Sequence, residues 1–112
     1  MLFAFASNDF NKYLDDPDVQ LMLTFEKGYK RAFEYIMNKF FPRIMNFIYR
    51  YVGNKEIAED LTQEVFIRVY KTAWKYSPQA KLSTWLFTIA KNISLNGLRR
   101  LNRRIISLDA PI

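Results

Sequence analysis

The sequence contains no cysteine and no histidine. These absences exclude a thiolate nucleophile, an imidazole base, and thiolate or imidazole metal ligands. Only carboxylate-based chemistry stays open, and it would require acidic side chains to converge in a pocket. An enzyme that uses Glu59, Asp60 and Glu64 is the weakest hypothesis, because helical spacing separates Glu59 from the other two. We expect a protein that is not an enzyme and that needs no cofactor and no metal.

Long hydrophobic runs are also lacking. The longest apolar stretch is Met1 to Ala6, far short of the roughly 20 residues that cross a bilayer. It has no basic leader and is shorter than the apolar core of a secretory signal. We therefore expect no membrane span and a cytoplasmic location, with which the absence of cysteine agrees.

Acidic residues are missing from residues 81–104, and the remaining tail holds only Asp109. The net charge is +6, from 17 Lys and Arg against 11 Asp and Glu, yet residues 1–80 are nearly balanced. Residues 81–104 hold no acid and six basic residues, which are Lys81, Lys91, Arg99, Arg100, Arg103 and Arg104. Aromatic residues beside a basic strip are typical of single-stranded nucleic-acid binding, because cations follow phosphates and rings stack on bases. A solvated basic surface or contact with an anionic lipid surface are the alternatives.

What the sequence does contain predicts one all-α domain. Its 112 residues are half hydrophobic and 17% aromatic, enough to bury a core. No strand-like alternation appears, so we expect a compact bundle of about four helices. We divide the chain into a leader at 1–15, a helical domain at 16–104, and a tail at 105–112 that begins a linker.

Capping residues predict the helix boundaries. Asp16 and Pro17 start a first helix that Lys27 and Gly28 close. A second helix covers 29–52 with an apolar stripe at steps of three and four, and Pro42 should kink or break it near Phe40. The stripe consists of Phe33, Ile36, Met37, Phe40, Ile44, Ile48 and Val52.

A third helix, capped by Asn54 and ending near Tyr76, has two different faces. The predicted core face carries Ala58, Leu61, Val65, Phe66, Val69 and Ala73. The opposite face carries Glu56, Asp60, Gln63, Glu64, Ile67 and Lys71. Such a face is either simply solvated or a protein-docking patch, in which an apolar residue is ringed by polar ones.

A turn at 77–80 separates this helix from the last one, because Pro78 disfavours helical geometry before it. We expect Ser83 to cap a fourth helix over 84–102, with a packing face of Leu86, Ile89, Ala90, Ile93 and Leu98. Gly97 should weaken this helix by about 1 kcal/mol relative to alanine. The tail from Ile105 lacks a helical period.

Two motifs carry a family resemblance. The first is Ala58-Glu59-Asp60-Leu61-Thr62-Gln63-Glu64-Val65-Phe66, and the second consists of Leu82-Ser83-Thr84-Trp85-Leu86 followed by Ile89-Ala90-Lys91-Asn92. Together they resemble region 2 of bacterial sigma factors, most of all the extracytoplasmic-function (ECF) group of the sigma-70 family. The resemblance covers about residues 16–104. The ending Ser107-Leu108-Asp109-Ala110-Pro111 is similar to the start of the linker that leads to region 4 in that family. Nothing after Ile112 could form region 4, so we expect either a piece of a longer protein, which we favour, or a protein that acts with region 2 alone.

The resemblance implies a transcription initiation module that binds core RNA polymerase. In the family this contact is made with the clamp coiled coil of the β′ subunit, through the helix with the Asp-Leu-x-Gln-Glu motif. The implied residues here are Asp60, Gln63 and Glu64, and the helical wheel adds Ile67 beside them, whereas Leu61 falls on the packing side. Many members also have an anti-sigma factor as a partner. No membrane partner is implied.

The resemblance also implies recognition of the promoter −10 element, through a flipped base of the non-template strand. Carried over, the DNA-binding set is Ser77, Gln79, Lys81, Trp85, Lys91, Asn92, Arg99 and Arg100. Asn92 would hydrogen-bond the base edge, and Lys91, Arg99 and Arg100 would contact phosphates. Core packing is the alternative for Trp85, and an exposed surface amide is the alternative for Asn92.

The sequence departs from the family in two places. Members often carry Arg-Asn where this chain has Lys91-Asn92, and this difference keeps the charge. Members also often carry an aspartate where this chain has Asn96, and this difference puts any ion pair there in doubt.

The remaining alternative function is a helical module that binds a protein or a membrane surface without sequence-specific DNA recognition.

Overall fold

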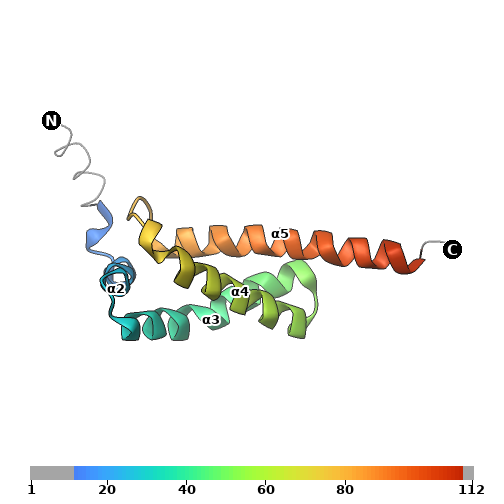
Figure 1. Ribbon diagram of the computed structural model, residues 1–112, viewed down its shortest axis with the longest axis horizontal. Coiled ribbons are helices and arrows are strands. Elements are labelled where there is room, and N and C mark those ends of the chain that lie inside the picture. The colour runs from blue at the N-terminus through green and yellow to red at the C-terminus, as the bar shows by residue number, and fades with distance from the viewer. Residues whose placement is uncertain (1–11, 110–112) are drawn as a thin grey trace.

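The computed structural model describes the backbone of residues 12–109 and the side chains of residues 12–105 (Figure 1). Over these residues the regular structure is helical, as the sequence predicts. Residues 12–14 are helical, and they are followed by α2 (Pro17–Glu26), α3 (Lys30–Val52), α4 (Lys55–Thr72), the short 3-10 helix η1 (Ala73–Lys75) and α5 (Leu82–Asp109). Helix α5 runs along the length of the molecule, and α3 and α4 lie along one side of it.

The predicted boundaries of α2 are confirmed. The Asp16 side chain accepts a hydrogen bond from the Asp18 amide at 2.9 Å, and Pro17 is the first helical residue. At the other end the Lys27 amide donates to the Leu23 carbonyl, and Gly28 takes a left-handed φ of 108°. That conformation favours glycine because it has no Cβ.

Helix α3 continues through Pro42 without a break. Pro42 is exposed, whereas Phe40 and Ile44 on either side of it are fully buried. Burial of these apolar neighbours offsets the amide hydrogen bond that proline cannot make. Of the predicted stripe, Met37 and Val52 are only half-buried and the other members are buried.

Helix α4 confirms both predicted faces. Asn54 caps it by accepting a hydrogen bond from the Ile57 amide at 3.0 Å. All six residues of the predicted core face are buried, and all six of the opposite face are exposed. The α-helix ends at Thr72, four residues before the predicted end, and continues as η1.

Helix α5 corrects two predictions. It begins at Leu82 rather than Thr84, so Ser83 lies inside it, and the first helical bond runs from the Trp85 amide to the Lys81 carbonyl. Leu82 is fully buried, and its burial draws the first turn into the bundle. The predicted tail is also wrong in part, because residues 105–109 are helical. Nothing in the sequence breaks the helix before Pro111, which disfavours helical geometry at Ala110.

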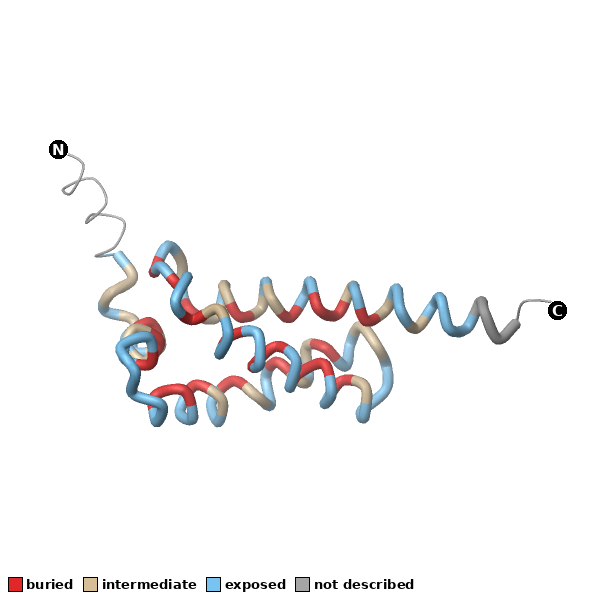
Figure 2. Tube along the Cα trace, viewed as in Figure 1, coloured by how far each residue is buried: buried red, intermediate tan, exposed pale blue. Residues whose placement is uncertain are grey.

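The core is one cluster of buried residues to which α2, α3, α4 and α5 all contribute (Figure 2). Helix α5 contributes Leu82, Leu86, Ala90 and Ile93 to it, while the predicted members Ile89 and Leu98 are half-buried. Gly97 of α5 lets this helix approach α4 closely, since a Cβ placed there would lie 2.8 Å from the Leu61 Cδ1 atom. Beyond this close approach α5 projects into solvent, and Ile105 is 55% exposed.

Candidate functional site

The turn between η1 and α5 forms the first candidate site. It borders a cavity of about 350 Å³ whose walls are Lys75, Tyr76, Ser77, Gln79, Ala80, Thr84, Trp85 and Thr88. We call it the turn pocket. The Trp85 ring is half-buried and packs edge-on against Tyr76, with 5.1 Å between the ring centroids. Trp85 therefore both packs inside the domain and presents an aromatic surface to the pocket.

Tyr76 forms a buried wall of the turn pocket. The residue is buried, and its hydroxyl has no hydrogen-bond partner among the described residues. Burial raises the pKa of Tyr76 to about 12, and the carboxylates of Asp16 and Glu26 act in the same direction. The phenol is therefore neutral throughout the physiological range and acts as a wall of the pocket, not as an acid or base.

The predicted DNA-binding residues do not all meet at this pocket. Ser77, Gln79 and Trp85 line it, and Lys81 is exposed between the turn and α5. Lys91 and Asn92 are exposed about two turns farther along α5. Both arginines lie farther still, since Arg99 is 17 residues beyond the start of α5, which is about 25 Å at 1.5 Å per residue.

A second candidate site is the groove between α4 and α5. Its lining residues are Ile57, Asp60, Leu61, Glu64, Gly97, Arg100, Leu101 and Arg104. We call it the charged groove. The Nη2 atom of Arg100 lies 3.5 Å from the Oε2 atom of Glu64, and both side chains are about half exposed. A predicted DNA-binding residue therefore pairs with a predicted polymerase-binding residue.

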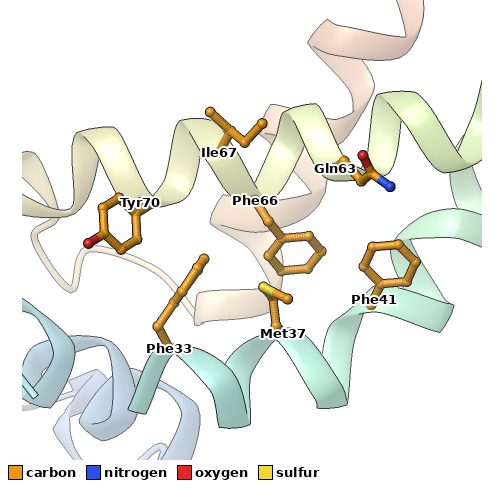
Figure 3. Close-up of a pocket in the computed structure, with 7 residues that line it drawn as sticks. All are labelled: Phe33, Met37, Phe41, Gln63, Phe66, Ile67 and Tyr70. Carbon is orange, nitrogen blue, oxygen red and sulfur yellow. The ribbon is translucent and has the colours of Figure 1, made fainter. Parts of the chain in front are cut away.

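On the other side of α4 lies an apolar pocket of about 340 Å³ between α3 and α4 (Figure 3). Its walls are Phe33, Met37, Phe41, Gln63, Phe66, Ile67 and Tyr70. The Phe41 and Phe66 rings stack with centroids 5.8 Å apart, and Ile67 remains 53% exposed. We call it the aromatic pocket.

These two hollows divide the predicted polymerase-binding set. All four residues are exposed on α4 as predicted, but Asp60 and Glu64 face the charged groove whereas Gln63 and Ile67 border the aromatic pocket. The outward side of α4 is thus a ridge with an acidic edge and an apolar edge. A helical wheel of α4 alone contains no information about which neighbours flank it.

The sequence reasoning missed several wall residues. Lys75, Thr84 and Thr88 line the turn pocket, and Phe33 and Phe41 line the aromatic pocket. The two threonines stand four residues apart on α5, a polar pair that could have marked the exposed edge of a mostly apolar segment. Phe33 was predicted as part of the buried stripe and Phe41 was not assigned, and no local pattern distinguishes a core ring from a pocket wall.

Two further findings bear on the predicted absences. Within residues 12–105 no group of three or more acidic side chains is arranged to hold a metal ion. Among the described helices none is both long enough and apolar enough to span a membrane.

Comparison with known proteins gives a consistent result. The family model of sigma-70 region 2 matches residues 36–104. The chain is 34% identical over 89 residues to the RNA polymerase sigma-H factor of Pseudomonas aeruginosa, covering 80% of this chain and 46% of that protein. It is 37% identical over 75 residues to the ECF RNA polymerase sigma factor SigW of Bacillus subtilis, covering 67% and 40%. The chain thus spans less than half the length of these relatives.

A solved structure is similar as well. It is the NMR structure of an engineered region 2 of sigmaE in complex with GTAAAA. Its TM-score with this chain is 0.71 and the sequence identity is 31%, over 78% of this chain and 90% of that one.

Proposed function

The chain belongs to the sigma-70 region 2 family, and from this premise we propose that it is a non-enzymatic promoter-specificity module. It binds core RNA polymerase through α4 and captures the promoter −10 element as an unpaired non-template strand in the turn pocket. The observation that carries the proposal is an open cavity beside a half-exposed tryptophan, in a stretch of sequence from residue 65 to residue 108 that contains no acidic residue.

The turn pocket has the chemistry that a flipped base needs. Extrusion of a base costs a few kcal/mol. Stacking on Trp85 offsets about 1 to 3 kcal/mol of this, and the polar groups of Ser77, Gln79, Thr84 and Thr88 are available to the base edge. The complex of the related sigmaE region 2 with GTAAAA supports this role.

From the pocket, the rest of the strand would follow α5. Lys91 and Asn92 come first, and Asn92 stands seven residues from Trp85, two turns along the same face. Arg99 lies about 25 Å from the start of α5. The strand would therefore reach Arg99 only several nucleotides beyond the base in the pocket. The arginines would thus contribute phosphate contacts outside the pocket rather than base recognition.

The α4 ridge has the composition of a protein interface. Ile67 supplies an apolar centre, and Asp60, Gln63 and Glu64 supply a polar rim. We propose that this ridge docks on the clamp coiled coil of the β′ subunit. An anti-sigma factor would inhibit the protein by covering the same ridge, and the site of action would be the cytoplasm.

The DNA-binding part is tested with a labelled single-stranded −10-like oligonucleotide and a scrambled control. With about three cations near the strand, the slope of log K against log salt should be roughly −2. Trp85→Ala should weaken binding about ten- to a hundredfold through the lost stacking. Tyr35→Ala is the matched control, because Tyr35 is 64% exposed and does not line the pocket. Equal affinity for the scrambled strand, or indifference to salt, would contradict the proposal.

The alternative, a helical interaction module without sequence-specific DNA binding, draws support from the aromatic pocket. That pocket offers apolar side chains to a partner and needs no nucleic acid. The oligonucleotide titration, combined with binding measurements to liposomes and to core polymerase, decides between the two functions. A chain that binds liposomes or core polymerase but no oligonucleotide would select the alternative.

A further inference from the structure

The aromatic pocket exposes apolar surface in addition to Ile67, the residue that the proposed polymerase contact uses. Ile67 is 53% and Tyr70 is 49% exposed, although both stand beside buried Phe66 (Figure 3). Side chains of α3 close the other side of the pocket. Exposed apolar surface of this kind marks a place where another segment binds.

We propose that this pocket is the docking site of the protein's own leader, residues 1–11, which lie outside the described part of the chain. The leader begins with Met1 to Ala6, the longest apolar stretch in the sequence, and carries no charged side chain before Asp9. Leu2, Phe3 and Phe5 supply the side chains that an uncharged, aromatic-lined hollow accepts. No acidic or basic side chain lines the pocket, so an uncharged segment suits it.

The attachment point of the leader makes this contact reachable. Tyr13 packs against the core, and its carbonyl accepts a hydrogen bond from the Asp16 amide at 3.1 Å. The leader therefore starts at the bundle surface, next to the N-terminal end of α2. At the opposite end of α2, the Phe25 ring lies 4.9 Å from the Phe33 ring and 5.4 Å from the Tyr70 ring, and both belong to the pocket.

The distances agree with this route. Helix α2 has 10 residues, so it is about 15 Å long. Eleven residues span up to about 36 Å when extended, which is more than twice that length. The leader can thus run the length of α2 and still place several side chains in the pocket.

The expected strength of the contact is modest. Burial of two phenylalanine rings supports an affinity in the millimolar range, and a short tether supplies an effective concentration of similar size. The leader should therefore occupy the pocket for roughly half of the time. Docking of this strength is readily displaced by a stronger partner.

The contact has a regulatory consequence that rests on the proposed function. Gln63 and Ile67 border the pocket and also belong to the ridge proposed to bind polymerase. A docked leader covers the apolar edge of that ridge. It should therefore compete with polymerase and raise the apparent dissociation constant about twofold.

The absence of native cysteine permits a direct test in the full chain. Ala4→Cys carries a nitroxide label, and methyl signals of isoleucine and methionine report how close the label comes. We expect strong attenuation at Ile67 and Met37. Ile57, on the charged-groove side of α4, and Ile105, at the far end of α5, serve as internal controls. Adding Leu2→Ser, Phe3→Ser and Phe5→Ser to the labelled chain should restore the Ile67 and Met37 signals, whereas Ser7→Ala should not.

Uniform attenuation, or none, would overturn the proposal. A mixture of labelled chains with isotope-enriched unlabelled chains identifies the occupant, because attenuation in that mixture would assign the pocket to a second copy and also overturn it. The triple serine variant should bind core polymerase about twofold more tightly than the unchanged chain, and equal affinity would overturn the competition. A chain that binds no polymerase would contradict the proposed function, yet leave the label measurement of docking intact.

Discussion

The turn pocket and the charged groove both contain residues predicted to bind DNA, but their charges are arranged differently. The turn pocket is bordered by Lys75, with Lys81 close by, and none of its lining residues is acidic. In the charged groove, Arg100 and Arg104 of α5 face Asp60 and Glu64 of α4. The lysines near the turn therefore face no acidic lining residue and can contact phosphate. In the charged groove, Arg100 is already paired with Glu64.

This difference shows why a run of basic residues is an imperfect guide to a binding surface. The net charge of a segment adds up its own residues only, whereas the field at a surface includes charges from every element packed against it. The acidic edge of α4 lowers the positive potential along the middle of α5. The turn pocket lies at the other end of α4, after the last acid of that helix, Glu64. The acids that act on it are Asp16 and Glu26, whose carboxylates raise the pKa of Tyr76, and none of the lining residues is acidic.

The largest expected effect concerns the acidic edge. Asp60→Lys or Glu64→Lys should weaken binding to core polymerase at least a hundredfold, about 3 kcal/mol, because like charges then meet at the interface. Both side chains are exposed, so circular dichroism should show an unchanged helical fold. Glu34→Lys on α3, an exposed acid outside the charged groove, is the matched control. Undiminished binding by both variants would remove the proposed polymerase contact.

A change at Gly97 tests how closely the walls of the charged groove approach. Gly97→Val should reduce the free energy of unfolding by about 1 to 3 kcal/mol, because a Cβ at this position lies 2.8 Å from Leu61 Cδ1. Asn96→Val places the same β-branched residue at an exposed neighbouring position and should cost less than about 1 kcal/mol. Urea unfolding measures both. Equal losses would mean that helix propensity, not helix contact, sets the effect.

Tyr76 gives a smaller effect with a characteristic pH dependence. Tyr76→Phe should raise the free energy of unfolding by about 1 kcal/mol at pH 7, because it removes a buried hydroxyl that has no partner among the described residues. The folded pKa is about 12 against an ordinary value of 10. Between pH 10 and pH 12 the unfolded tyrosine therefore loses its proton before the folded one does, and the unchanged protein loses stability as pH rises.

The difference in the free energy of unfolding between Tyr76→Phe and the unchanged protein should accordingly grow from about pH 10 to pH 12 by as much as about 2 kcal/mol. Denaturant titrations of both proteins at pH 7, 10 and 11 measure the difference. Tyr35→Phe is the control, because Tyr35 is 64% exposed. A pH-independent difference would show that the hydroxyl of Tyr76 is not protected from ionisation.

The smallest effect concerns the ion pair itself. Glu64→Gln should change stability by no more than about 1 kcal/mol, since both partners are half exposed. It should release Arg100 for phosphate and make the salt slope of oligonucleotide binding steeper by about 0.7. Glu59→Gln removes the same charge from α4 outside the groove. If both variants steepen the slope equally, net charge and not the Arg100 contact is responsible.

Local signals in the sequence determined much of the fold. The caps at Asp16 and Asn54 and the two faces of α4 follow from patterns within one helix, and the structure confirms them. The predicted start of α5 at Thr84 was wrong, because the helix begins at Leu82 and the burial of Leu82 depends on what packs against it. The absence of a break at Pro42 has the same origin, since tertiary burial of Phe40 and Ile44 offsets the hydrogen bond that proline cannot make.

For the candidate site, the sequence by itself determined which residues are exposed on α4, which residues flank the turn, and where acids are absent. Only the tertiary structure decided that Asp60 and Glu64 face one groove while Gln63 and Ile67 border another, that Arg100 pairs with Glu64, and that the arginines lie far from the turn pocket. A helix sets the positions of residues three and four apart through its own hydrogen bonds. Which helix lies beside it is set by packing between segments distant in sequence, and no pattern within one helix contains that information.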